Sequence, residues 1–132
     1  MSNNLQDQIT TATPTFTSES HHLAWSLATA ADERKAEDII ILNVSEVSYL
    51  TEYFVIVTGF STTQVRAIAD SMEHKAETEL QRVPLRTQGQ SEGSWVVLDY
   101  GGVIAHILLP TERKYYNLEA FWGHGGRVDF QA

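Results

Sequence analysis

The chain has 132 residues, of which 17 are acidic and 9 are basic, so its formal net charge at pH 7 is −8. This length predicts a single domain, and a hydrophobic fraction of 42% is enough for a packed core. There is no cysteine, which excludes disulfides and zinc–thiolate sites within the chain. The basic residues are scattered, which argues against tight non-specific nucleic-acid binding, since that needs a clustered positive face.

No apolar run approaches the roughly 18 residues needed to cross a bilayer. The N-terminal residues also lack a basic region followed by an apolar core, so a secretory signal is not expected. The absence of cysteine fits a reducing compartment. We therefore expect a cytoplasmic protein that has no membrane contact.

Residues 1–19 are rich in Ser, Thr, Asn and Gln, which predicts a disordered tail. The domain is expected over residues 20–124, and the glycine-rich residues 125–132 predict a flexible C-terminal tail. The first helix is predicted from Ser20 to Lys35 by its apolar spacing. The continuous apolar run Ile39–Leu42 then predicts a strand that is covered on both faces.

The segment that begins at Tyr53 predicts a strand, a tight turn and a helix. The apolar run Tyr53–Val57 leads directly into Gly59, and Ser61 follows as a good helix N-cap. Gln64, three residues after Ser61, completes a capping box. A helix is predicted from this cap to about residue 82, because Pro84 disfavours helical geometry before it.

Three further strands are predicted over residues 85–87, 95–100 and 103–109. Gly101-Gly102 lies between the last two, which is a signal for a two-residue hairpin. Residues 110–122 predict helical turns. Together these elements predict one α/β domain with a mixed sheet of about five strands, flanked by helices.

A two-residue turn fixes the hairpin register and therefore the side chains that share each face. One face is nearly all apolar and is the better core candidate: Val96, Leu98, Tyr100, Val103, Ala105 and Ile107. The other face mixes large apolar groups with a carboxylate and an imidazole: Trp95, Val97, Asp99, Ile104, His106 and Leu108. This mixed face suits protein binding. The spacing alone slightly favours the alternative, in which helices cover the face and His106 is a hydrogen-bonded core residue.

The sequence gives little support to a catalytic function. The turn from Gly59 to Ser61 could hold a phosphate, but no glycine fingerprint or P-loop lysine accompanies it, and capping already accounts for Ser61. Asp99 is the only carboxylate in the predicted strands, which is a poor metal site. A triad of Ser61, Asp99 and His106 lacks a nucleophile elbow. We expect no catalytic residue, cofactor or metal.

His21, His22 and His124 show no metal-binding spacing with His74 or His106, and these three are expected in solvent. The aromatic residues near the C-terminus could stack bases. With few basic residues between them, a helical stripe that packs on the sheet is favoured. Tyr115, Leu118 and Trp122 stand at the spacing of that stripe.

Several motifs together resemble one family. The segments Thr51–Gln64, Gly93–Gly101 and Val103–His106 are similar to the ribosomal silencing factor family, also called RsfS or Iojap. The pattern R-x-Y-Y-x-L-E-x-F-W at Arg113–Trp122 matches its C-terminal signature. The resemblance covers about residues 20–124.

Three positions depart mildly from the family pattern. Glu52 stands where the family usually has Asp, Gly102 replaces a common Asp, and Ala105 replaces a common Val. The last two lie in the predicted hairpin, and they affect its tip more than its mixed face.

The resemblance implies a fold related to nucleotidyltransferases but without their catalytic carboxylates. It implies binding to the fourteenth protein of the large ribosomal subunit, which blocks joining of the small subunit and represses translation when nutrients are scarce. It also implies a homodimer when the protein is free. The implied partner contacts are Trp95, Asp99 and His106, together with Tyr100, Tyr116, Leu118 and Glu119.

The favoured interpretation is therefore a non-enzymatic factor that acts by occupying a ribosomal surface. Its acidic net charge suits a basic ribosomal protein as partner. Two alternatives remain open from the residues alone. One is a nucleotidyltransferase-like enzyme that binds a nucleotide at the Gly59–Ser61 turn, and the other is a dimeric interaction module unconnected with ribosomes.

Overall fold

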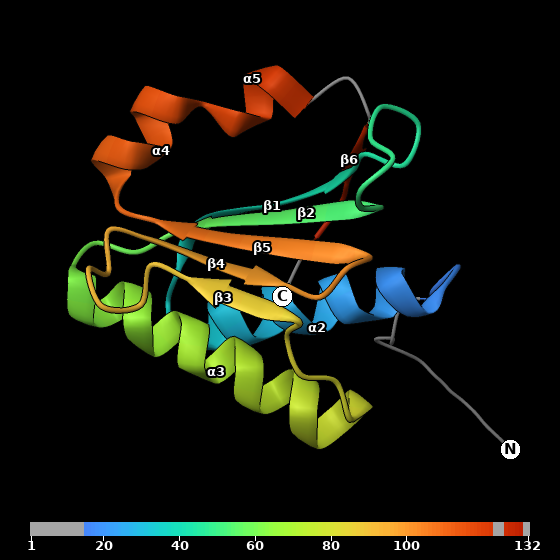
Figure 1. Cartoon of the computed structure of the whole chain (residues 1–132), viewed down its shortest axis with the longest axis horizontal. Helices are drawn as coiled ribbons and strands as arrows, with labels where there is room; N and C mark the ends of the chain where they lie inside the picture. Colours follow the sequence, from blue (N-terminus) through green and yellow to red (C-terminus); the bar gives the residue numbers. More distant parts are fainter. Residues whose placement is uncertain (1–14, 123–125, 131–132) are drawn as a thin grey trace, which may run out of the picture.

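The computed structural model describes residues 15–122 and 126–130, and these form one α/β domain around a mixed sheet (Figure 1). The strands are β1 Glu37–Asn43, β2 Tyr53–Thr58, β3 Arg86–Gln88, β4 Trp95–Asp99, β5 Val103–Leu108 and β6 Arg127–Val128. The helices are α2 Glu19–Glu33, α3 Thr62–Leu80, α4 Pro110–Tyr116 and α5 Leu118–Trp122. The predicted fold class is confirmed.

The sheet has the strand order β3-β4-β5-β2-β1-β6. Strands β2 and β5 run parallel, and the other neighbouring strands of the described residues pair antiparallel. The predicted hairpin register is confirmed, with Asp99 opposite Ile104, Val97 opposite His106 and Trp95 opposite Leu108. Strand β5 lies in the middle of the sheet, so its side chains are covered more fully than those of β4.

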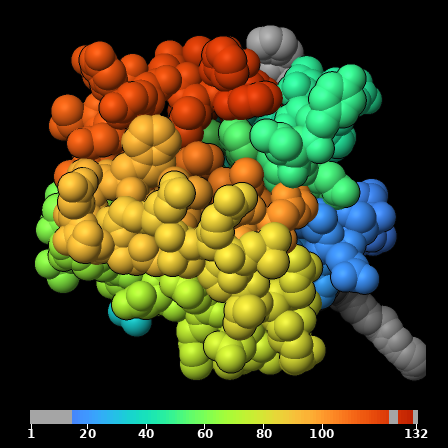
Figure 2. Space-filling view, in the orientation of Figure 1, coloured from blue at the N-terminus to red at the C-terminus, as the bar shows by residue number. Residues whose placement is uncertain are grey.

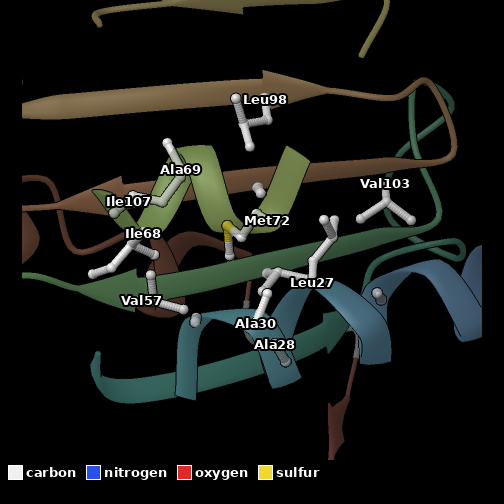
Figure 3. Packing of buried hydrophobic residues seen from close by; sticks show 14 of the residues in the cluster. Leu27, Ala28, Ala30, Val57, Ile68, Ala69, Met72, Leu98, Val103 and Ile107 are labelled. Carbon is white, nitrogen blue, oxygen red and sulfur yellow. The ribbon is translucent and has the colours of Figure 1, made fainter. Parts of the chain in front are cut away.

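Two helical layers cover the sheet unequally. Helices α2 and α3 lie across one face, and the shorter α4 and α5 lie over part of the other (Figure 1). Beneath α2 and α3, Leu27, Ile68 and Met72 meet strand side chains such as Val57 and Leu98 (Figure 3). This is the predicted apolar face of the hairpin, and it forms the larger core.

A second, smaller apolar cluster lies on the opposite face of the sheet. Its buried members are Ile40, Leu42, Val44, Phe54, Ile56 and Leu108. Leu118 and Trp122 of α5 pack against them. Two of the three predicted stripe residues therefore pack on the sheet as expected.

Capping residues fix the starts of the long helices. Ser18 Oγ accepts a hydrogen bond from His21 N at 3.0 Å, so α2 begins at Glu19 and the predicted tail over residues 1–19 is too long. Residues 1–14 of that tail lie outside the described residues. Ser61 Oγ accepts from Gln64 N at 3.0 Å, which confirms the predicted cap of α3.

The described part of the C-terminal segment contains a strand that the sequence analysis did not predict. Strand β6 pairs with β1, with Val128 opposite Ile41, and Phe130 packs on Trp25 at a ring-centroid distance of 4.8 Å. Apolar side chains at alternate positions, 128 and 130, let this short segment join the sheet and core. This corrects the expected flexible tail for these residues, whereas positions 123–125 and 131–132 lie outside the described residues.

Candidate protein interface

One part of the sheet face beside α4 is left open. On this face the side chains of β5, such as His106 and Leu108, are buried, whereas Trp95, Val97 and Asp99 on β4 are only half-buried. We call the following residues the open sheet face: Arg86, Gln88, Trp95, Val97, Asp99, Ile104 and Tyr116. Figure 2 shows the orange-red α4–α5 segment above the yellow and light-orange surface of β3, β4 and their connecting loop.

Trp95 and His106 form a hydrogen-bonded pair that links the surface to the core. Trp95 Nε1 donates to His106 Nδ1 at 3.1 Å. Burial lowers the pKa of His106 to about 4, so the ring is neutral at pH 7 and its proton lies on Nε2. Phe54 packs against the imidazole at a ring-centroid distance of 5.0 Å. His106 is thus the covered, hydrogen-bonded residue that the spacing had favoured, and it holds Trp95 in place.

Asp99 has two structural partners at the end of the hairpin. Its Oδ1 accepts from Gly101 N at 2.9 Å, which shapes the turn. Its Oδ2 forms an ion pair with Arg86 Nη2 at 3.3 Å. The Arg86 side chain is 75% exposed and that of Asp99 20%, so the pair presents mainly the guanidinium to a partner.

Tyr116 completes the aromatic part of the open sheet face. Its ring lies 4.7 Å from that of Trp95, centroid to centroid, and half of the residue is exposed. The predicted stripe is wrong for Tyr115, which is 80% exposed. The reason is Asn117, whose left-handed backbone (φ 45°) ends α4 and shifts the helical phase, so that Tyr116 meets the sheet instead.

Leu118 and Glu119 lie away from Trp95, on the β1 side of the domain. The carboxylate of Glu119 pairs with Arg113, with Nε–Oε1 and Nη2–Oε2 distances of 3.1 Å. Arg113 also donates to Thr58 Oγ1 and to the carbonyl oxygen of Asp38, both at 2.8 Å. Glu119 therefore holds α4 and α5 on the sheet, and Leu118 packs in the smaller core. The motif containing Arg113 was recognised in the sequence, but the partners of this side chain were not.

Tyr100 lies on the opposite face of the sheet from the open sheet face. It is 2% exposed and belongs to the core beneath α2 and α3. Burial raises the pKa of its hydroxyl, with a smaller contribution from Glu73, which keeps the phenol protonated. The structure therefore does not present this side chain to a partner at the open sheet face.

The catalytic alternatives lose their geometric basis. Gly59 is explained by packing, since a Cβ there would lie 2.9 Å from Val65 Cγ2, and the glycine lets α3 approach the end of β2. Ser61 follows the C-terminal end of β2, beside Leu108, whereas Asp99 pairs near the other end of β5. A triad that includes His106 is therefore not formed. Among the described residues, no group of three or more His, Asp or Glu side chains could hold a metal ion.

The described helices include none that is both long and apolar enough to span a bilayer.

Comparisons with known proteins agree on one family. The family model described as "Ribosomal silencing factor during starvation" matches residues 17–132. Ribosomal silencing factor RsfS of Bacillus subtilis is 38% identical over 102 residues, covering 77% of this chain and 86% of that protein. The chloroplastic Iojap protein of maize (Zea mays) is 41% identical over 107 residues, covering 80% of this chain and 46% of the maize protein. The chain thus spans about half the length of this plant relative.

Solved structures show the same fold. A crystal structure of a protein from Chromobacterium violaceum is 33% identical and superposes with a TM-score of 0.76, covering 87% of this chain and 94% of that one. A second, from Bacillus halodurans, is 35% identical with a TM-score of 0.68, covering 83% and 95%. The chain therefore belongs to the ribosomal silencing factor (RsfS/Iojap) family of non-enzymatic silencing factors that bind the large ribosomal subunit.

Proposed function

We propose that this chain binds the fourteenth protein of the large ribosomal subunit through the open sheet face. By occupying that surface it blocks joining of the small subunit and so represses translation when nutrients are scarce. The observation that carries the proposal is the aromatic pair of half-buried Trp95 on β4 and half-exposed Tyr116 on α4, beside the part of the sheet that α4 and α5 leave uncovered.

The chemistry of this face supports protein binding. Trp and Tyr are the side chains that most often dominate interface energetics, and charged residues around them supply specificity. Here the ion pair of Arg86 and Asp99 lies on the same face at the other end of β4, with Val97 between it and Trp95. The net charge of −8 also complements a basic ribosomal protein.

The seven residues implied by the resemblance then divide into two groups. Trp95, Asp99 and Tyr116 are proposed as direct contacts. The other four are proposed as positioning residues that shape the domain beneath the contact surface: Tyr100, His106, Leu118 and Glu119.

Co-sedimentation with purified large subunits tests the contact surface. Tyr116→Ala is expected to weaken binding at least about tenfold, because it removes an aromatic anchor from the open sheet face. Tyr115→Ala is the matched control, since it removes the same group from the adjacent, more exposed position. Equal binding by both folded variants would overturn the assignment of the surface. No co-sedimentation of the wild-type chain would favour the interaction module unconnected with ribosomes.

Small subunits added to the same mixture test the mechanism. The wild-type chain is expected to lower the fraction of joined particles in proportion to its occupancy of large subunits. Tyr116→Ala should require at least about tenfold more protein for the same effect. If large subunits carry the protein and still join small subunits normally, steric blocking is wrong even though the binding surface stands.

We also propose that the free chain forms a homodimer, as the family resemblance implies, and that it works in the cytoplasm, as the features of the sequence led us to expect. Light scattering after size-exclusion chromatography measures the mass directly. The expected mass is twice that of one 14.8 kDa chain. A single-chain mass at all concentrations up to about 100 μM would contradict the dimer, since useful homodimers form at micromolar affinity or better.

A further inference from the structure

A groove of about 390 Å³ lies at one end of the open sheet face, between α4 and the loop that joins β3 to β4. Trp95 and Tyr116 supply its aromatic lining. Two carboxylates, Glu92 from the loop and Glu112 from α4, line the same groove. The resemblance assigned contact roles to the two aromatic residues but none to the acidic ones.

The two carboxylates of this groove have no cation of their own. In the described parts of the chain, the ion pairs are formed by Lys75, Arg86 and Arg113, and none of them involves Glu92 or Glu112. Glu112 Oε1 is buried and has no hydrogen-bond partner among the same residues. The two carboxylates without an ion-pair partner give the groove a negative charge, which favours a cationic ligand.

Nearby basic groups are already engaged elsewhere. Arg66 donates to the carbonyl oxygens of Gln90 and Ser91, both at 2.8 Å, and so fixes the β3–β4 loop. Arg86 is paired with Asp99. The negative charge of the groove is therefore left for a partner.

The lining of the groove is preformed. A Cβ at Gly89 (φ +87°) would lie 2.0 Å from the carbonyl oxygen of Trp95, so only glycine lets the end of β3 approach β4 this closely. Gly93 N donates to Gly89 O at 2.9 Å and closes the loop. On the opposite side, the hydrogen bond to His106 fixes the Trp95 ring. Binding of a ligand in the groove therefore costs little free energy for ordering the protein.

We propose that this groove binds an arginine side chain of the partner protein, with the guanidinium against the aromatic lining and paired with Glu112 and Glu92. The inference rests on the proposed function and specifies the chemistry of the partner's anchor. A guanidinium combines a planar face that stacks on aromatic rings with a fork of donors that matches a carboxylate. An apolar side chain would leave both carboxylates without a cation, and an anion would be repelled.

The direct test uses acetyl-arginine-amide as the probe and the indole N–H signal of Trp95 as the readout. Trp95→Phe identifies that signal among the three tryptophans of the chain. The signal is expected to shift saturably with acetyl-arginine-amide. Binding should be at least about tenfold weaker for acetyl-citrulline-amide, which has the same shape without the charge. Equal binding of citrulline-amide or acetyl-lysine-amide would overturn the proposal.

Variants that each remove one negative charge test where acetyl-arginine-amide binds. Glu112→Gln and the exposed Glu92→Gln are each expected to weaken binding of acetyl-arginine-amide, Glu112→Gln by about tenfold or more. Glu77→Gln makes the same change in net charge at an exposed position of α3, outside the groove, and should leave binding unchanged. If the folded Glu112→Gln and Glu92→Gln proteins both bind like Glu77→Gln, the site is wrong.

Large-subunit co-sedimentation separates this proposal from the one on which it rests. If the wild-type chain binds large subunits and acetyl-arginine-amide does not perturb Trp95, the arginine groove fails and the proposed function stands. If acetyl-arginine-amide binds as described and large subunits do not, the groove stands and the proposed function fails. If both hold, Glu112→Gln is expected to lower the affinity for large subunits by about tenfold.

Discussion

Trp95 and His106 act as one unit at the scale of single residues. Trp95 is half-buried at the open sheet face, whereas His106 is nine-tenths buried and accepts a hydrogen bond from the indole N–H at 3.1 Å. A protonated His106 would carry a donor at Nδ1 and could no longer accept this bond. The neutral imidazole is therefore a condition for the observed position of the Trp95 ring.

The stability of the protein should depend on pH through His106. Its pKa is 6.5 when unfolded and about 4 when folded, so the unfolded state binds more protons between these values. The contribution is fully present above pH 6.5 and is lost as the pH falls toward 4. From pH 7 to pH 5 it should lower the free energy of unfolding by about 2 kcal/mol. Urea unfolding at intermediate pH values measures this change.

His106→Phe provides the control for this pH dependence. The variant is expected to be less stable at pH 7, because Trp95 Nε1 loses its acceptor, at a cost of about 1–3 kcal/mol. Its free energy of unfolding should nevertheless fall less between pH 7 and pH 5 than that of the wild type. The same fall in both proteins would show that other groups cause it.

The sequence predicted the neighbours of these residues better than their exposure. The two-residue turn fixed which hairpin residues face one another, and that register holds at every pair. The ring of His106 packs on Phe54, and Phe54 packs in turn on Trp122, which comes from a helix more than ten positions later. The periodicity of a hairpin contains no information about side chains that cover it from a distant part of the chain. Only the structure therefore shows that Trp95 is half-buried whereas His106 is buried.

At the scale of elements, the short α4–α5 layer depends on polar contacts. Neither helix has a fully buried residue, and both have seven residues or fewer. Arg113, whose side chain is only 10% exposed, joins this layer to Glu119, to Thr58 of β2 and to Asp38 at the bulge of β1. The position of Tyr116 beside Trp95 follows from this attachment.

Arg113→Lys is expected to loosen this layer while leaving the larger core intact. Lysine keeps the charge but lacks the planar fork that reaches three partners at once, and the loss should be about 2 kcal/mol. Hydrogen exchange should show faster exchange in residues 118–122 and little change in α3. Lys114→Arg, at the exposed neighbouring position, is the control. Unchanged protection of residues 118–122 would contradict this role of Arg113.

Elements with strong local signals were predictable, and those made by long-range contacts were not. Ser61, Gln64 and Pro84 marked the limits of α3 because capping and proline act within a few residues. Strand β6 has only two residues, and it is a strand because it pairs with β1 at the edge of the sheet. The divided helix α4–α5 depended on a left-handed Asn117, which the helical stripe did not reveal.

At the scale of the whole molecule, the two faces of the sheet have different tasks. The larger core lies entirely between the sheet and α2–α3, so it does not depend on the open sheet face. This arrangement lets one face carry half-exposed aromatic and charged groups while the other stabilises the fold. Substitutions at exposed positions such as Tyr116 should therefore change binding more than stability.

The net charge of −8 should make association with the large subunit sensitive to salt. Charge steers the encounter over roughly a Debye length, which is about 10 Å at 0.1 M salt, whereas close contacts mainly set the dissociation rate. Raising monovalent salt from about 50 to 300 mM at constant magnesium should slow association by about tenfold. Stopped-flow mixing with large subunits measures both rate constants.

Tyr116→Ala separates steering from contact in this experiment. The substitution removes no charge, so the dependence of the association rate constant on salt should match that of the wild type. Its dissociation rate constant should be raised by a similar factor at every salt concentration, because the lost aromatic contact acts after the encounter. A wild-type association rate constant that does not change with salt would mean that the acidic charge plays no part in finding the ribosome. An altered salt dependence in Tyr116→Ala would mean that this residue shapes the encounter as well as the bound state.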